Sequence, residues 1–243
     1  STTQTAAALM PITVAYGETR IDLSVPGAVP LAELLPGLLQ AHSRLDTAVA
    51  SQGVTVLTTS GDQLDQSRSL RILWLLELLG VPYELDQHGR DPETLRAPDA
   101  LKRIHPLGKA PVLQDGELVL AESGAIVDYL IQTYGNGRFM PAMGTPDYWQ
   151  YQRWLHYAEG SLMPLMVLAL LMGRAETAPM PFFARPFARK FTDGIRKAWI
   201  FPQTALHLGH VEQSLQGQRW LCGEALTGAD VMMSFPLQAA RRR

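Results

Sequence analysis

The order of hydrophobic periodicities along the chain limits its fold more than any other feature. Before Glu122, alternating apolar residues predict short strands that occur between helices. After Asp147 every patterned segment has helical spacing, in 148–173, 187–216 and from Asp230 onward. We therefore expect α/β structure followed by an all-α half.

The first part of the chain is predicted as a β-hairpin, a helix and a third strand. Residues 12–16 and 19–25 alternate on either side of Gly17-Glu18, which is typical of a hairpin turn. Pro30 opens a short amphipathic helix, and residues 54–59 form the next strand candidate. Further elements follow: a helix from Leu70 to Gly80, a strand at 83–87, a helix around 94–103, a hairpin turning at Asp115-Gly116 and a helix over 122–134.

Composition excludes several classes of protein. The chain has 243 residues, a formal charge of −2 and a single cysteine, Cys222, so we expect neither a disulfide framework nor a multi-cysteine metal site. The near-neutral charge argues against a nucleic-acid-binding protein. The longest apolar run, 162–172, contains Pro164 and is shorter than the roughly 20 residues of a membrane span. Residues 1–10 lack the pattern of a signal peptide, so we expect a cytoplasmic protein with no membrane partner.

The segment 10–70 resembles the ubiquitin-like (β-grasp) N-terminal domain of EccD proteins of type VII secretion. The likeness is carried by ITVAYGETRIDLSVPGAVPLAELLPGLL and by the order strand, strand, helix, strand. It includes no catalytic residue.

From about residue 65 to Arg243 the chain resembles cytosolic glutathione S-transferases. Four blocks carry the likeness in the family's order: QSRSLRILWLLELLGVPYEL, HPLGKAPVL, LAESGAIVDYL and WLCGEALTGADVMMSF. The resemblance implies a thioredoxin-like domain and a helical domain after a partial ubiquitin-like segment. We expect boundaries at 1–53, 54–136, a linker at 137–146, and 147–243.

The block around Lys109 has two interpretations. Pro111 lies between a loop and a strand, where an X-Pro bond can be cis. The resemblance implies that Ala110-Pro111 is cis, that Val112 offers backbone groups to the cysteinyl part of glutathione, and that Lys109 lies beside its glycyl carboxylate. From the residues alone, a turn proline and a solvated lysine explain the block equally well.

Glu122 and Ser123 stand where a strand ends and a helix begins. Such a helix start is an anion site, although an ordinary helix cap has the same residue types. The resemblance implies that Glu122 contacts the γ-glutamyl ammonium and Ser123 its carboxylate.

Ser67 and Ser69 flank Arg68 at the expected start of the first helix of the glutathione-binding domain. The resemblance implies that a hydroxyl there, which we assign to Ser67, stabilises the glutathione thiolate; the alternative is that both serines cap the helix. Arg71 is interpreted as structural or as part of a domain interface.

Other candidate residues receive structural interpretations. We interpret Cys222 as a buried apolar residue and Thr227 with Asp230 as a capping box. An apolar set from the helical half is expected to form core, with part of it available for a second-substrate pocket: Trp149, Trp154, His156, Tyr157, Met163 and Met166.

Two features depart from the family pattern. Gly61-Asp62 interrupts the approach to Ser67, so either 54–59 serves as the first strand with an enlarged loop, or that strand is poorly formed and Ser67 is displaced. The family has further helices after Asp230, so we expect apolar surface to be exposed around Val231, Met232 and Phe235.

Two hypotheses about function result. The first is a homodimeric glutathione transferase that activates the glutathione thiol for attack on a small electrophile, with glutathione as cosubstrate and no metal. The second is a non-catalytic binding protein on the same scaffold, or a fusion, in which the ubiquitin-like segment docks a protein partner.

Overall fold

The computed structural model describes residues 9–16, 19–26, 54–60, 68–89 and 99–241, and it divides the chain into two compact units, Ser1–Ser51 and Gln52–Arg243. In the first unit, β1 (Leu9–Tyr16) and β2 (Thr19–Pro26) form an antiparallel pair, with Tyr16 opposite Thr19. The predicted hairpin is thus confirmed. The helix predicted after Pro30 lies outside the described residues.

The second unit contains a four-stranded sheet in the order β4-β3-β5-β6. Its strands are β3 (Val54–Ser60), β4 (Tyr83–Gly89), β5 (Val112–Asp115) and β6 (Leu118–Ala121). β3 runs parallel to β4 and antiparallel to β5, and β6 returns antiparallel to β5. This arrangement confirms the expected thioredoxin-like topology.

Strand β3 is an inner strand of this sheet. Val54, Val56 and Leu57 are buried, and Leu57 is paired with both Asp86 of β4 and Val112 of β5. The first of the two alternatives for this strand is therefore correct: residues 54–60 form the first strand of the glutathione-transferase-like sheet.

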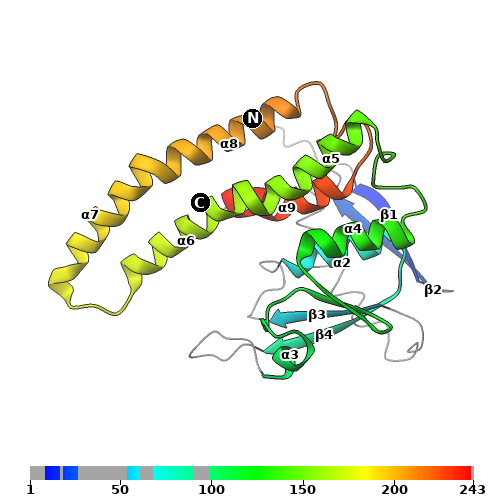
Figure 1. Cartoon of the computed structure of the whole chain (residues 1–243), viewed down its shortest axis with the longest axis horizontal. Helices are drawn as coiled ribbons and strands as arrows, with labels where there is room; N and C mark the ends of the chain where they lie inside the picture. The colour runs from blue at the N-terminus through cyan, green and yellow to red at the C-terminus, as the bar shows by residue number, and fades with distance from the viewer. Residues whose placement is uncertain (1–8, 17–18, 27–53, 61–67, 90–98, 242–243) are drawn as a thin grey trace, which may run out of the picture. The chain divides into compact units, whose positions relative to one another are not determined.

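Helices cover both faces of the sheet (Figure 1). α2 (Ser69–Leu79) and α4 (Ser123–Tyr134) contact each other on one face, and α3 (Asp99–Ile104) lies on the other, where Leu101 packs against Leu57 and Val112. α2 ends at Gly80, whose φ of 71° is the left-handed conformation that suits glycine at a helix end.

The helical half begins with one continuous run. α5 (Pro146–Tyr157) passes through a π-helical turn, η2 (Ala158–Leu162), into α6 (Met163–Thr177). Pro164 follows the π-helical turn η2 almost directly, and the helical run continues through it. Among the described residues, 146–177 is the one helix that passes a length-and-composition test for crossing a membrane, a test that core helices of soluble domains also pass.

The chain then returns beside α6. η3 (Phe182–Ala184), α7 (Arg185–Ile195), η4 (Arg196–Ile200) and α8 (Phe201–Ser214) form the second long helical stretch in Figure 1. We call α6, η3, α7 and η4 the helical arm. The last helix, α9 (Gly228–Arg241), contacts α2, α4 and α5.

α9 starts with a network of hydrogen bonds centred on Asp230. One oxygen, Oδ2, accepts bonds from the backbone N–H and the hydroxyl of Thr227, both at 2.9 Å, and Oδ1 accepts from the N–H of Leu221 at 2.9 Å. The acidic half of the predicted capping box is present, while the Thr227 hydroxyl donates to Asp230 rather than accepting from the helix.

The expected exposure of α9 is wrong. Val231 and Met232 are fully buried and Phe235 is partly buried, because α9 packs between the sheet-covering helices α2 and α4 and the helix α5. Large exposed apolar side chains occur on the helical arm instead.

Candidate functional site

Three segments of the candidate site meet at one edge of the sheet. Val112 is opposite Ala121 in β6 and Leu57 in β3. Continuing these antiparallel registers by one residue places Pro111 beside Glu122 and beside the carboxyl-terminal part of β3. The Lys109 block, the start of α4 and the end of β3 therefore lie together.

Glu122 has an unusual backbone conformation at this edge. Its φ of 72° and ψ of 117° are rare for a residue with a Cβ, and its side chain is exposed. Such conformations cost roughly 1–3 kcal/mol and are concentrated at functional sites. The next residue, Ser123, is only 5% exposed and begins α4. The pair thus presents an exposed carboxylate directly before a helix N-terminus.

A buried guanidinium lies beneath the start of α4. Arg71 of α2 is 1% exposed, and its Nη2 donates to Ser123 Oγ at 3.1 Å and to Glu159 Oε1 at 2.6 Å. Its Nη1 donates to the carbonyl oxygen of Met232 at 3.1 Å. Burial lowers the pKa of Arg71, and the charge of Glu159 opposes that shift. One side chain thus joins α2, α4, η2 and α9, which confirms its predicted place at an interface.

The Ala110-Pro111 peptide bond is cis, as the resemblance implied. Lys109 is exposed and Ala110 is partly buried. Val112, in contrast, is fully buried, and it is paired with strands on both sides. Its backbone therefore belongs to the sheet, and Ala110 is the better-placed residue of this block for pairing with an extended ligand.

A shallow cavity of about 390 Å³, largely open to solvent, begins where α2 begins. Arg68, the residue before α2, lies at its polar side with Glu159, and the Arg68 Nε to Glu159 Oε2 distance is 3.5 Å. The remaining walls are apolar and come from α6: Met163, Pro164, Val167, Leu168 and Leu171. An apolar molecule held there would lie beside the N-terminal end of α2.

Ser67, the predicted thiol partner, lies outside the described residues. Ser69 is fully buried at the first position of α2. The assignment of Ser67 stays a prediction.

The remaining candidates are structural in the described part of the chain. Trp154 and Met166 are core residues, Trp149 is 64% exposed, and only Met163 of the predicted set lines the cavity. Burial raises the pKa of Cys222 to about 11, so this thiol is protonated at neutral pH and a poor nucleophile. Over the ranges that the structure describes, no three His, Cys, Asp or Glu side chains are grouped to hold a metal.

Glu159 is the site residue that the sequence reasoning missed. Two arginines of the α2 start, Arg68 and Arg71, contact its carboxylate. A signal was present: Glu159 is the single acidic residue between Asp147 and Glu176, and it directly precedes the apolar run 162–172. An isolated carboxylate in such a helix indicates a cationic partner.

The fold and the site define a thioredoxin-like domain joined to a helical domain, and comparisons with known proteins agree. Residues 67–133 match the family "Glutathione S-transferase, N-terminal domain". Residues 9–73 match the WXG100 secretion-system protein YukD, which fits the ubiquitin-like resemblance of the first segment.

Relatives of known class cover most of the chain. Glutathione S-transferase 3 of Schizosaccharomyces pombe is 35% identical over 74% of this chain and 73% of its own length. Glutathione S-transferase 1 of Saccharomyces cerevisiae is 37% identical over 74% and 80%. A glutathione S-transferase structure from Actinobacillus pleuropneumoniae has 40% identity and a TM-score of 0.58 over 78% of both chains. The chain belongs to the glutathione S-transferase family.

A more distant structure agrees in fold. The glutathione transferase homologue of Lodderomyces elongisporus, solved with two glutathione molecules per subunit, is 20% identical with a TM-score of 0.60, over 79% of this chain and 85% of its own.

Proposed function

We propose that the chain is a cytoplasmic glutathione transferase that binds reduced glutathione along the edge formed by Lys109, Ala110, Glu122 and Ser123. The Glu122 carboxylate faces the γ-glutamyl ammonium, and Ser123 with the start of α4 holds the γ-glutamyl carboxylate. Ala110 offers backbone groups to the cysteinyl residue, and Lys109 meets the glycyl carboxylate as a point charge. Pro111 and Val112 shape and anchor the edge rather than contact the tripeptide.

The observation that carries this proposal is the contact between Arg71 and Ser123. Because Ser123 Oγ accepts a bond from the guanidinium, its own proton is free to be donated to a carboxylate. The buried positive charge and the helix N-terminus both favour an anion at that point. A serine that only capped the helix would not need a cation beneath it.

The chemistry takes place between the start of α2 and the cavity. The Ser67 hydroxyl and the N-terminal end of α2 stabilise the glutathione thiolate, and the thiol proton leaves to solvent. The sulfur attacks an electrophilic carbon of a small apolar molecule, a carbon–sulfur bond forms, and the leaving group departs with its electron pair. The apolar residues of α6 listed above form the wall against which that molecule lies.

Calorimetric titration with reduced glutathione and a conjugation assay with 1-chloro-2,4-dinitrobenzene test the proposal. Removing a hydroxyl that donates to a charged sulfur costs about 1.5–3 kcal/mol, so Ser67→Ala should lower kcat roughly 10- to 100-fold with little change in glutathione affinity. Ser214→Ala, which removes a hydroxyl on α8 that bonds the carbonyl of His210, is the matched control. Equal loss of kcat and affinity would make Ser67 a helix cap, and a folded chain that binds no glutathione would overturn the proposed function.

A further inference from the structure

The polar side of the cavity carries more positive than negative charge. Arg68 and Arg71 both contact Glu159, and within the part of the chain that the structure describes this is the one carboxylate with which they form ion pairs. Two guanidinium groups and one carboxylate leave a net charge of +1. Arg71 is buried and Arg68 is 39% exposed, so a ligand in the cavity meets this excess charge at Arg68.

The two arginines share the Glu159 carboxylate unequally. Arg71 Nη2 lies 2.6 Å from Oε1, whereas Arg68 Nε lies 3.5 Å from Oε2. Hydrogen bonds between charged nitrogen and oxygen are about 2.7–2.9 Å long, so only the Arg71 contact is a close one. Glu159 therefore compensates mainly the buried charge of Arg71. The guanidinium of Arg68 has several N–H donors and keeps the capacity to bind a second anion.

An aromatic ring helps to hold Arg68 at the cavity. The Cζ atom of Arg68 lies 5.6 Å from the ring centre of Phe235 in α9, and that of Arg71 lies 5.3 Å from the same ring. Both distances are within the range of a cation–π attraction. Because Arg68 is positioned by Phe235 and Glu159 before any ligand arrives, less side-chain freedom is lost when it binds one.

The other walls of the cavity are apolar and come from α6. Because the cavity is shallow and open, shape selects among small molecules only weakly, and the charge at its polar side has more influence. The arginine fork matches the geometry of a carboxylate, while a cationic molecule would be repelled. We propose that Arg68 is a specificity-determining residue that selects a small apolar electrophile bearing a carboxylate as the second substrate. This inference rests on the proposed function, which places the second substrate in this cavity.

A pair of substrates that differ in charge tests the proposal with the full chain at saturating glutathione. The pair is 4-chloro-3-nitrobenzoate and the neutral 4-chloro-3-nitrobenzamide. In both, the glutathione sulfur attacks the carbon that bears chlorine, a carbon–sulfur bond forms, and chloride leaves with the electron pair of the broken bond. Each kcat/KM is divided by the rate constant of the uncatalysed reaction with glutathione, which removes the difference in intrinsic reactivity. We call the resulting acid-to-amide ratio the acid preference.

The wild-type acid preference should be about fivefold, the upper size of a partly exposed ion pair, and it should decrease as salt is added. The preference should arise in KM, because the carboxylate is bound equally before and during the reaction. Arg68→Gln should bring the ratio close to one, Arg68→Lys should retain most of it, and Arg68→Glu should favour the amide. Glu159→Gln removes the competing carboxylate and should raise the ratio at least about twofold.

The opposite effects at Arg68 and Glu159 separate selection from a structural role. If their ion pair only fixed the start of α2, Arg68→Gln and Glu159→Gln would change the ratio in the same direction. Arg103→Gln on α3 and Glu212→Gln on α8 remove exposed charges on helices that do not line the cavity, so their acid preference should equal that of the wild type. Because both substrates meet the same protein, a change in overall activity or stability cancels in the ratio.

Three results would overturn the proposal. The first is a wild-type chain that conjugates both compounds without preferring the acid. The second is an acid preference that Arg68→Gln and Arg68→Glu leave unchanged. The third is a change in the same direction in Arg68→Gln and Glu159→Gln. All three leave the proposed function intact, whereas a folded wild-type chain that conjugates neither compound nor 1-chloro-2,4-dinitrobenzene would overturn the proposed function together with this inference.

Discussion

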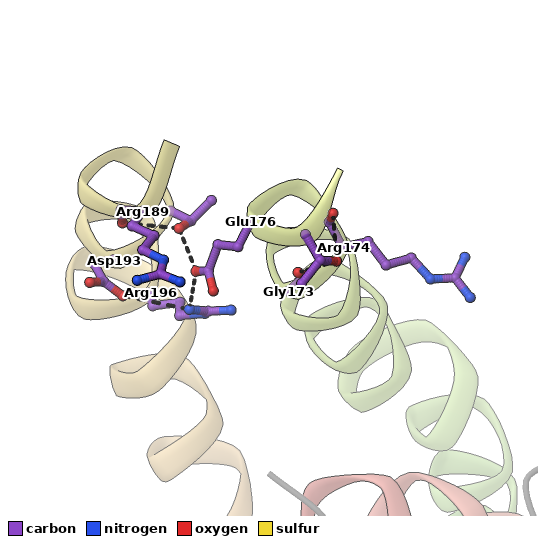
Figure 2. Close-up of polar contacts among 8 residues, drawn as sticks. Gly173, Arg174, Glu176, Arg189, Asp193 and Arg196 are labelled. Carbon is purple, nitrogen blue, oxygen red and sulfur yellow. Dashed lines mark hydrogen bonds and ion pairs between the residues drawn. The ribbon is translucent and has the colours of Figure 1, made fainter. Parts of the chain in front are cut away.

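Two regions of the second unit use arginine–carboxylate pairs in opposite ways. At the start of α2, Arg71 is 1% exposed and each of its polar partners comes from a different element. In the helical arm, Arg196 and Glu176 are each about one-fifth exposed and join only α6 to the following helices, as Figure 2 shows. The difference indicates that a buried guanidinium can fix several elements in place around a site, whereas a partly exposed ion pair only links two helices.

Removing Arg71 should have the largest effect. In Arg71→Ala the Glu159 carboxylate loses a partner in a partly buried position, and we expect about 3 kcal/mol less stability, measured by urea unfolding. Glutathione affinity should fall as well, because Ser123 loses its hydrogen-bond donor. Arg71→Met combined with Glu159→Gln should recover most of the stability but not the affinity, and Arg103→Ala is the exposed control. Equal recovery of both would show that the guanidinium has no part in the site.

Asp230→Ala tests whether the packing of helices around Arg71 also depends on the start of α9. The substitution leaves two backbone N–H groups and one hydroxyl without their acceptor, so we expect a loss of about 2 kcal/mol in urea unfolding. Glu117→Ala, at an exposed turn, should change stability by less than about 0.5 kcal/mol. If Asp230→Ala lowers the free energy of unfolding no more than Glu117→Ala does, the hydrogen bonds of Asp230 do not stabilise α9.

Glu176→Gln tests the tether in the helical arm, and we expect a smaller loss than for Asp230→Ala. The hydrogen bond from Thr192 and the charge of Arg196 hold the pKa of Glu176 below its usual 4.5. The stabilisation is therefore present above that pH and is lost as the pH falls through the lower pKa of the folded state. Amide hydrogen exchange in α7 should speed up below pH 4.5 in the wild-type chain, beyond its intrinsic pH dependence, and not in Glu176→Gln. Glu212→Gln on α8 should behave as wild type does.

Deleting Ser1–Ser51 should have the smallest effect on the glutathione site. All contacts described for the site come from the second compact unit, and β3 begins after the deleted part. We expect the glutathione Kd, measured by calorimetry, to stay within about twofold, because regions that share no contacts act nearly independently. If the shortened chain is unfolded or binds no glutathione, the first segment belongs to the core. The hypothesis that this segment is a separate module that docks a protein partner would then be wrong.

Local patterns predicted most of the described elements. The pairing of residues 9–16 with 19–26, the end of α2 at Gly80 and the hairpin at Asp115-Gly116 depend on residues close in sequence, and all three predictions are confirmed. The partners of Arg71 are 52, 88 and 161 residues away in the sequence, so no local pattern could identify them. The prediction that Val231 and Met232 are exposed was wrong for the same reason, because their burial depends on where α9 packs. The site assignments came from the family resemblance, and Ser67 is still a prediction.

The inner strand β3 has a consequence for how new genes arise. It lies in the stretch that matches YukD and not in the stretch that matches the glutathione S-transferase domain, yet it completes the sheet of the latter. A strand is recognised by its neighbours mainly through backbone hydrogen bonds and alternating apolar side chains, which Val54, Val56 and Leu57 supply. A recombination event that joins two unrelated reading frames just after such a strand keeps the sheet intact, so the strand is an interchangeable part at which natural or laboratory crossovers can be placed.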